Sequence, residues 1–178
     1  MFNESQMTLA QDWIGQSSLV GWFASEKLNG CRAYWDGKFF WTRAGNKIQV
    51  PQNFAKNLPS FHLDGEIHAG RGVGLGNENS AYKIAMRAVV HGAKWFTPDV
   101  IFTAFDAPQA AGNWMERMRA VPFMLAIHRA TIFNPFDLVE YMTNLRNLGT
   151  EGACFRNPAE TCYRAGRTGN LLRWKFLK

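Results

Sequence analysis

The sequence predicts an α+β fold in a single domain. Short strand-like segments come in antiparallel groups, helical segments stand between the groups, and no regular βαβ alternation runs along the chain. The 178 residues suit one domain, and no repeat, low-complexity tract or linker divides them. With 47% hydrophobic and 19% charged residues, the chain can bury a core and is not a disordered segment.

Three segments carry the signals of helices. Ser80 is an N-cap candidate before an apolar pattern with i, i+3, i+4 spacing, and Gly92 ends that pattern. Asn134 and the proline after it match an N-cap and a first helical position, and Gly149 ends the helix that they begin. A shorter helix is predicted over residues 114–119.

The strand candidates lie between and around these helices. Asp36-Gly37 is a two-residue hairpin signal between two of them. The candidates are residues 31–35, 38–43, 62–68, 100–105, 152–156 and 171–176.

Composition excludes several classes of protein. No apolar run approaches the roughly 20 residues that cross a bilayer, and residues 1–12 lack the basic and apolar regions of a signal peptide. Cys31, Cys154 and Cys162 form no C-x-x-C pair and the four His have no ligand spacing, so we expect no disulfide framework and no protein-held transition metal. This cysteine usage fits a reducing compartment, and we expect a cytoplasmic protein with no membrane partner.

The charge favours a polyanionic partner. Twenty Lys and Arg face 14 Asp and Glu, which gives +6, and Arg outnumbers Lys by twelve to eight. Arginine binds phosphate in a planar, bidentate way. A basic charge that serves only solubility explains the composition equally well.

The first chemical motif is the stretch from Ser25 to Arg32, which contains Lys27, Gly30 and Arg32. Gly30 lets the backbone turn and approach a ligand. Arg32 on the following strand places a like charge near Lys27, which favours the neutral, nucleophilic amine. The alternative is a solvated loop.

The second motif is Leu63-Asp64-Gly65-Glu66. On a strand, Asp64 and Glu66 share a face, where two carboxylates can bind ribose hydroxyls or orient Mg²⁺. An exposed strand edge is the alternative.

Three further motifs follow. Phe105 ends a strand and either stacks on a base or belongs to the core. Glu151 is an isolated carboxylate before a strand. Arg173 and Lys175 share one face of the last strand, as a phosphate clamp or as a basic strand without a ligand. The glycine-rich stretch 70–76 has neither dinucleotide-binding nor P-loop spacing and is predicted to be a loop.

Taken in order, these motifs resemble those of the ATP-dependent DNA ligases, in particular the minimal bacterial and phage type. Capping guanylyltransferases and RNA ligases share the lysine motif but not Arg-Ala-Tyr-Trp-Asp-Gly or Thr-Arg-x-Gly-Asn beside it. The matching stretches begin at Leu9 and Gly21 and include residues 25–37, 42–46, 63–66, 70–72, 105–108, Glu151-Gly152, Arg156, 166–167 and 171–175.

The resemblance implies an ATP-grasp-like nucleotidyltransferase domain over residues 1–178, made of antiparallel sheets flanked by helices and lacking the C-terminal OB-fold domain of relatives. It implies an enzyme that forms a lysyl-AMP intermediate from ATP with Mg²⁺, passes AMP to the 5′-phosphate of nicked double-stranded DNA and seals the nick. We expect a monomer, and a protein that supplies the OB function in trans is a candidate partner. Since some relatives are exported, the location is periplasmic if a leader has been removed.

The resemblance also assigns roles to residues. Lys27 matches the nucleophile, Arg32 and Glu66 the residues that hold the ribose, and Phe105 the aromatic that stacks on adenine. Glu151 matches a carboxylate tied to Mg²⁺. The nucleotide-binding set that it implies is Glu26, Lys27, Arg32, Arg43, Glu66, Phe105, Arg173 and Lys175.

Two departures from the family pattern, Asn29 and the expected lack of the OB-fold domain, support a second hypothesis, and Arg173 is a milder change. Asn29 stands where the motif has Asp, so the carboxylate that helps to activate a 3′-hydroxyl is missing. Arg173 replaces the usual first lysine of the closing motif. Together with the expected lack of the OB-fold, Asn29 suggests as the alternative an impaired ligase-like domain that binds nucleotide or nicked DNA without efficient turnover.

Overall fold

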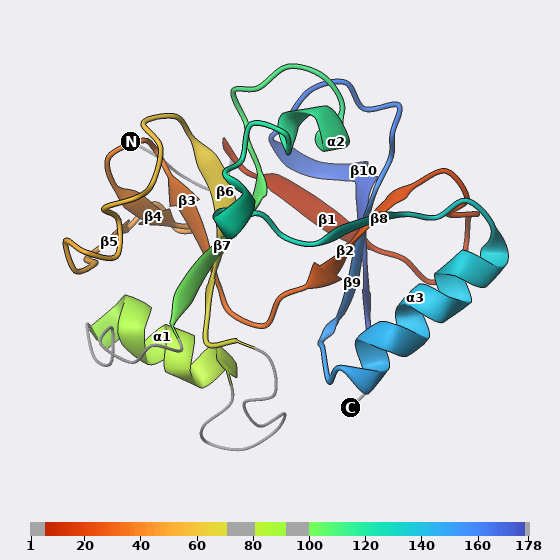
Figure 1. The fold of residues 1–178 in the computed structure, drawn as a ribbon, viewed down its shortest axis with the longest axis horizontal. Coiled ribbons are helices and arrows are strands. Elements are labelled where there is room, and N and C mark those ends of the chain that lie inside the picture. The colour runs from red at the N-terminus through yellow and green to blue at the C-terminus, as the bar shows by residue number, and fades with distance from the viewer. Residues whose placement is uncertain (1–5, 71–80, 92–99, 177–178) are drawn as a thin grey trace.

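The computed structural model describes residues 6–70, 81–91 and 100–176, which form two five-stranded sheets with helices outside them (Figure 1). The first sheet has the order β1-β10-β9-β2-β8 and the second the order β5-β4-β3-β6-β7. The strands of the first sheet are β1 (Thr8–Asp12), β2 (Phe23–Lys27), β8 (Arg129–Thr131), β9 (Gly152–Arg156) and β10 (Gly166–Lys175). Those of the second are β3 (Cys31–Trp35), β4 (Phe40–Thr42), β5 (Lys47–Ile48), β6 (Leu63–His68) and β7 (Ile101–Asp106).

Helices cover the outer sides of the sheets. α1 (Ala81–His91) lies beside the second sheet, and α3 (Pro135–Asn147) lies beside the first (Figure 1). The short helix α2 (Trp114–Arg117) and the 3-10 helix η2 (Phe123–Leu125) belong to the connection from β7 to β8. The predicted α+β class is confirmed, and the predicted helices are found where α1, α2 and α3 lie.

One pairing differs from the predicted antiparallel sheets. β1 pairs with β10 in parallel, with a shift in register between Ala10 and Gln11. A parallel pair needs a long crossover connection, and here nearly the whole chain separates the two strands. Strands β1, β2, β5 and β8 had no sequence prediction, because each is short and lacks a turn signal of its own.

The hairpin between β3 and β4 forms, but its loop is longer than predicted. Trp35 pairs with Phe40, so four residues turn between them rather than the two residues Asp36-Gly37. The Asp36 carboxylate accepts from the backbone N–H of Lys38 and of Phe39, and the Asp36 N–H donates to the Phe39 carbonyl. These bonds stabilise the longer turn in preference to a two-residue turn.

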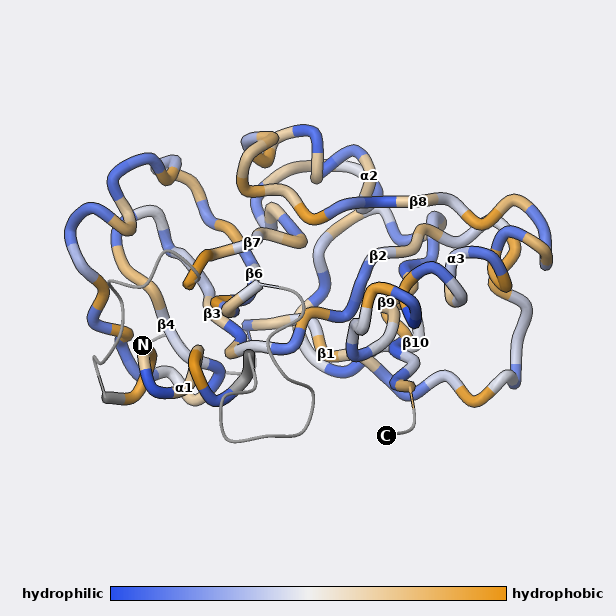
Figure 2. Tube along the Cα trace, turned by 60° about the horizontal axis from the view of Figure 1, so that its bottom comes forward, coloured by the Kyte–Doolittle hydropathy of each residue, from blue (hydrophilic) through white to orange (hydrophobic). Residues whose placement is uncertain are grey.

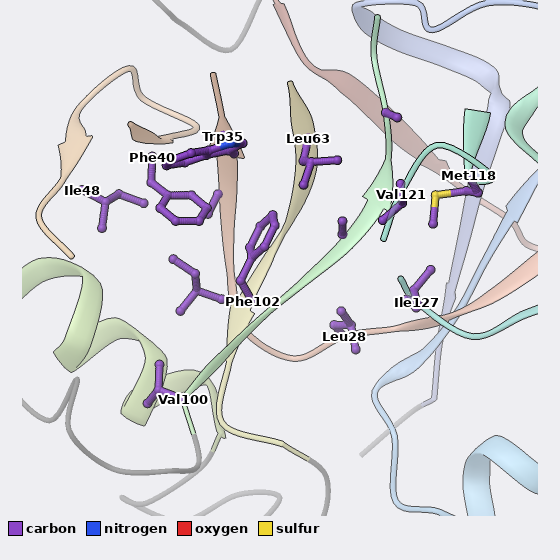
Figure 3. Close-up of a cluster of buried hydrophobic side chains, with 14 of the residues drawn as sticks. Leu28, Trp35, Phe40, Ile48, Leu63, Val100, Phe102, Met118, Val121 and Ile127 are labelled. Atoms are coloured by element: carbon purple, nitrogen blue, oxygen red, sulfur yellow. The ribbon is translucent and has the colours of Figure 1, made fainter. Parts of the chain in front are cut away.

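Two apolar clusters form the core. The larger packs between the second sheet and the β7–β8 connection, and Figure 3 shows Trp35 and Phe102 on either side of Phe40. The smaller lies under α3, where Met142 and Leu145 contact the cluster around Phe155. Hydrophilic and hydrophobic residues alternate along α3 in Figure 2, as expected of a helix with one buried face. Each sheet therefore has a core of its own, and Phe23 of β2 also packs against the larger cluster.

The start of α3 agrees with its sequence signal. The Asn134 side chain accepts from the N–H of Phe136 and of Asp137, and Asp137 accepts in return from the Asn134 N–H. This reciprocal cap satisfies N–H groups that have no partner inside the helix.

Some predictions lie outside the described residues. These are the cap at Ser80, the helix end at Gly92 and most of the glycine-rich stretch 70–76. Within the described part of the chain, no helix has the length and apolar character that crossing a membrane requires.

Candidate functional site

A cleft between the two sheets collects most of the predicted site residues. It measures about 230 Å³ and is lined by residues of both sheets. Seven of the predicted residues line it: Glu26, Lys27, Arg32, Arg43, Glu66, Phe105 and Arg173.

Lys27 stands at the passage from one sheet to the other. It is the last residue of β2 in the first sheet, and β3 in the second sheet begins four residues later. Gly30 lies in this connection against β6, where a Cβ would come within 2.3 Å of the Ile67 carbonyl oxygen. A side chain at position 30 would therefore push the lysine loop away from the second sheet.

Lys27 and Lys175 share one carboxylate. The Lys27 Nζ lies 2.6 Å from Glu151 Oε2, and the Lys175 Nζ lies 2.9 Å from Glu151 Oε1. Burial would raise the pKa of Glu151, but the hydrogen bonds and charges of the two lysines outweigh burial and lower that pKa. A charged carboxylate between two ammonium groups marks a position where an anion is strongly favoured.

Glu66 behaves differently from Glu151. Its Oε1 accepts from the Gly30 N–H at 2.7 Å. Burial raises the pKa of Glu66 to about 7, although the charges of Lys27 and Arg32 and the bond from Gly30 act in the opposite direction. Glu66 therefore changes its charge near neutral pH, beside the lysine.

Arg32 is held by Asp64 from the other predicted motif. The Arg32 Nε and Nη2 donate to the two oxygens of Asp64 at 2.7 and 2.5 Å, and Nη2 also donates to the Thr8 carbonyl. Asp64 is fully buried and accepts a further bond from the Tyr163 hydroxyl at 2.5 Å. Thus Asp64 orients the arginine, and within the described part of the chain its bonds use Nε and Nη2.

Phe105 is half-buried, and its position is compatible with both predictions, a core residue and an aromatic face for a base. It packs against the larger core cluster and also lines the cleft. The Arg32 guanidinium lies 4.8 Å from its ring centroid. An aromatic face at the wall of the cleft is suited to contact a flat ligand.

The closing strand carries the two basic residues in different environments. Arg173 Nε donates to Asp12 Oδ1 at 2.6 Å at the cleft's edge, and the hydrogen bond from Arg173 lowers the pKa of Asp12. Lys175 contacts Glu151 instead. Arg43 is exposed on the loop after β4 and reaches the cleft from the second sheet.

Three predicted residues, Asn29, Glu151 and Lys175, are not among those that line the cleft, and Glu26 lines it but also borders a second hollow. Glu26 is buried and lines a second hollow against α3, on the face of β2 opposite to Lys27. Asn29 is half-buried in the loop two residues after Lys27.

Several residues of the site had no sequence prediction. Tyr163 accepts from the Thr8 N–H and donates to Asp64, and Asp12 binds Arg173. Arg156 also lines the cleft; it is one of the residues that match the ligase motifs, but no role was predicted for it. Tyr163, Thr8 and Asp12 stand in no motif, so no signal pointed to them. The C-terminal end of the predicted strand 152–156 was the available signal for Arg156.

The described residues include no cluster of three or more His, Cys, Asp or Glu that could hold a metal. The carboxylate of Glu151 nevertheless fits Mg²⁺, because this ion is often bound by one or two carboxylates together with substrate phosphates. Two lysines beside the same carboxylate provide the place for such phosphates.

The chain is similar in sequence to a known DNA ligase. It is 30% identical over 184 residues to a DNA ligase of Haemophilus influenzae, and the match covers 98% of this chain. The chain spans 65% of the length of that relative. No protein-family model matches the chain.

Solved structures agree with this similarity. A Lig E DNA ligase, described as binding DNA with a minimal scaffold, superposes with a TM-score of 0.77 at 26% identity, over 96% of this chain and 68% of the other. The Chlorella virus DNA ligase-adenylate gives 0.77 at 19% identity, over 97% and 67%. The predicted nucleotidyltransferase fold is therefore confirmed.

Proposed function

We propose that this chain, a relative of DNA ligases with the fold of their nucleotidyltransferase domain, carries AMP on Lys27 as the catalytic core of an ATP-dependent DNA ligase. The cluster in which Lys27, a residue of the cleft wall, shares Glu151 with Lys175 is the observation that carries the proposal. It combines a candidate nucleophile with positive charge for phosphate in a partly buried place.

The first step forms a bond between Lys27 Nζ and the α-phosphorus of ATP and breaks the bond to the β-phosphate oxygen. Pyrophosphate leaves, and Nζ must lose a proton before it attacks. Glu151 lies at 2.6 Å from this nitrogen and can accept the proton or hold it until phosphate arrives. Lys175 and Arg173 supply positive charge where the phosphate oxygens gain negative charge.

Mg²⁺ fits beside Glu151. When bound, it neutralises charge on the phosphates and favours departure of pyrophosphate. The protein positions the nucleotide around it: Arg32 and Glu66 toward the ribose, and Phe105 toward the base. In the second and third steps AMP moves to the 5′-phosphate of a nick, and the 3′-hydroxyl displaces it. The surplus of Lys and Arg over Asp and Glu binds the phosphates of the DNA backbone and does not recognise base sequence.

The intact mass of the protein tests this proposal. Incubation with ATP and Mg²⁺ should add the mass of AMP, and pyrophosphate should remove it. The Lys27→Ala variant should gain no mass, whereas Lys38→Ala, which changes an exposed lysine far from the cluster, should gain it normally. An AMP adduct on Lys27→Ala would overturn the assignment of Lys27 as the nucleophile. If the native chain forms no adduct, binding of nucleotide or nicked DNA remains as its function.

Asn29 favours the alternative function, in which a ligase-like domain binds nucleotide or nicked DNA without efficient turnover. Asparagine keeps the shape of aspartate but lacks its charge. If the chain is a weakened enzyme, Asn29→Asp should raise sealing of a nick that already carries 5′-AMP by about tenfold or more. No sealing by either protein, with retained binding of the nick, would support the binding module instead.

A further inference from the structure

Asn29 and Gly30 form the single Asn-Gly pair in the sequence. An asparagine amide is thermolabile, because the backbone nitrogen of the next residue can attack the side-chain carbonyl carbon and release ammonia. A side chain on that next residue hinders the ring closure, whereas glycine leaves the nitrogen accessible. Residues 29 and 30 are therefore the place in this chain where loss of an amide is sterically easiest.

The fold requires the glycine of this pair. A Cβ on Gly30 would lie 2.3 Å from the Ile67 carbonyl oxygen and 2.7 Å from the His68 Cβ, closer than packed atoms approach. The pair thus depends on position 29, where the ligase motif has aspartate and this chain has asparagine. Conversion of this one amide to a carboxylate would give the chain the residue of the motif.

The loop leaves the Asn29 side chain free to react. Residues 28–30 connect β2 to β3 and belong to no helix or strand, and Asn29 is half-buried there. In the part of the chain that the structure describes, no hydrogen bond holds its amide. By contrast, the side chains of Asn113, Asn134 and Asn157 each accept from a backbone N–H, which fixes their orientation.

Glu66 supplies a base for the attacking nitrogen. The Gly30 N–H donates to Glu66 Oε1 at 2.7 Å, so a carboxylate oxygen already contacts the proton that must leave. Burial raises the pKa of Glu66 to about 7, and the charges of Lys27 and Arg32 act in the opposite direction. The charged form, which can accept a proton, is therefore populated at neutral pH.

We propose that the Asn29-Gly30 pair is a self-modification site, at which the Gly30 nitrogen displaces the Asn29 amide with Glu66 as the base and hydrolysis leaves aspartate at position 29. In the first step the bond between the Gly30 nitrogen and Asn29 Cγ forms, and the bond from Cγ to Nδ2 breaks. The Gly30 proton passes through Glu66 to Nδ2, which departs as ammonia. Water then breaks the new bond at Cγ, returns a hydrogen to the Gly30 nitrogen and leaves a carboxylate.

The modification itself goes beyond the proposed function, but its effect on activity rests on that function. Newly made protein lacks the carboxylate of the sealing motif, and the carboxylate appears as the protein ages. Sealing of a nick should therefore increase with time. Hydrolysis at the other carbonyl of the ring, that of the Asn29 backbone, gives isoaspartate, which lengthens the backbone between Lys27 and Gly30.

Peptide mapping over time tests the modification. The tryptic peptide 28–32 gains the mass of OH in place of NH2 when Asn29 loses its amide. The native chain is incubated at neutral pH, either folded or in guanidinium chloride, which removes Glu66 from the loop. We expect the folded chain to react about tenfold faster or more, as for a positioned general base. The exposed Asn46, which no glycine follows, is the internal control and should keep its amide.

Variants isolate the part of Glu66. Glu66→Gln keeps an acceptor for the Gly30 N–H but cannot take its proton, so the folded variant should react about tenfold more slowly than the native chain. Glu140→Gln, on the exposed side of α3, should react as the native chain does. A folded native chain that reacts no faster than the unfolded one, or a folded Glu66→Gln that reacts at the native rate, would overturn the proposal. The first of these comparisons needs no variant to fold.

Sealing by aged protein tests the product. The substrate is a nick that already carries 5′-AMP, and the control is Asn29→Gln, whose longer side chain closes the ring poorly. The native rate should rise with the deamidated fraction toward the rate of Asn29→Asp. An endoprotease that cleaves before aspartate but not before isoaspartate identifies the product, and isoaspartate alone would overturn the proposal. If aspartate forms but Asn29→Asp does not seal, the proposed function fails and the modification stands.

Discussion

The Tyr163 hydroxyl donates to the buried carboxylate of Asp64 at 2.5 Å, and so joins the segment before the last strand to the middle of the second sheet. Asp64 in turn orients Arg32, and the Tyr163 oxygen also accepts from the Thr8 N–H. One hydroxyl thus connects three segments that are remote in sequence, and the wall of the cleft depends on it.

Replacement of Tyr163 by phenylalanine tests this connection. The change leaves one oxygen of Asp64 and the Thr8 N–H without their partner, so we expect a loss of about 1–2 kcal/mol in stability. For a domain of this size the melting temperature should fall by roughly 2–8 °C. ATP affinity should fall as well, because Arg32 is held less firmly. An unchanged melting curve would show that water replaces the hydroxyl without cost.

Glu66 makes stability depend on pH near neutrality. Its pKa rises from 4.5 to about 7 in the folded protein, chiefly through burial. The folded state therefore binds the proton more tightly, and the stabilisation is complete below about pH 4.5 and is lost as pH rises to about 7. Urea titrations from pH 5 to 8 should show the native chain losing on the order of 2 kcal/mol relative to Glu66→Gln.

The variant Glu66→Gln keeps an oxygen that can accept from the Gly30 N–H, so it isolates the charge. Lys27, Arg32 and Glu151 are the charged groups that act on Glu66. Parallel stability profiles for the two proteins would contradict the raised pKa.

Glu151 should set the metal requirement of adenylylation. Glu151→Gln removes the charge that fits Mg²⁺ and leaves Lys27 and Lys175 facing each other without their shared anion. We expect formation of the AMP adduct to slow by about tenfold or more, with half-maximal rate at a higher Mg²⁺ concentration. The rate is measured by intact mass over a Mg²⁺ series. Glu140→Gln, on the exposed side of α3, is the control, and equal Mg²⁺ curves for all three proteins would exclude this role.

Phe105 can be tested by a change that preserves most of its packing. Phe105→Leu should lower ATP affinity by about 1–3 kcal/mol, because leucine lacks the flat face that a base stacks on. The cost in stability should stay below about 1.5 kcal/mol, since the side chain is half-buried and the replacement remains apolar. Calorimetry and thermal melting separate the two effects. A large loss of stability with native ATP affinity would place Phe105 in the core alone.

The sequence predicted those features that depend on neighbouring residues. Helix α3 begins where Asn134 and its proline predict, and β9 has the predicted bounds, because caps and apolar alternation act between neighbours in sequence. The order of the motifs predicted the nucleotidyltransferase fold, and it named seven of the residues that line the cleft. These signals depend only on residue type and spacing.

The tertiary structure alone decided which of these residues meet. Lys27 contacts Glu151 across 124 residues, Arg32 is held by Asp64 and Tyr163, and β1 pairs in parallel with β10 at the opposite end of the chain. No periodicity encodes such contacts, because they depend on how two separately packed sheets close around one cleft.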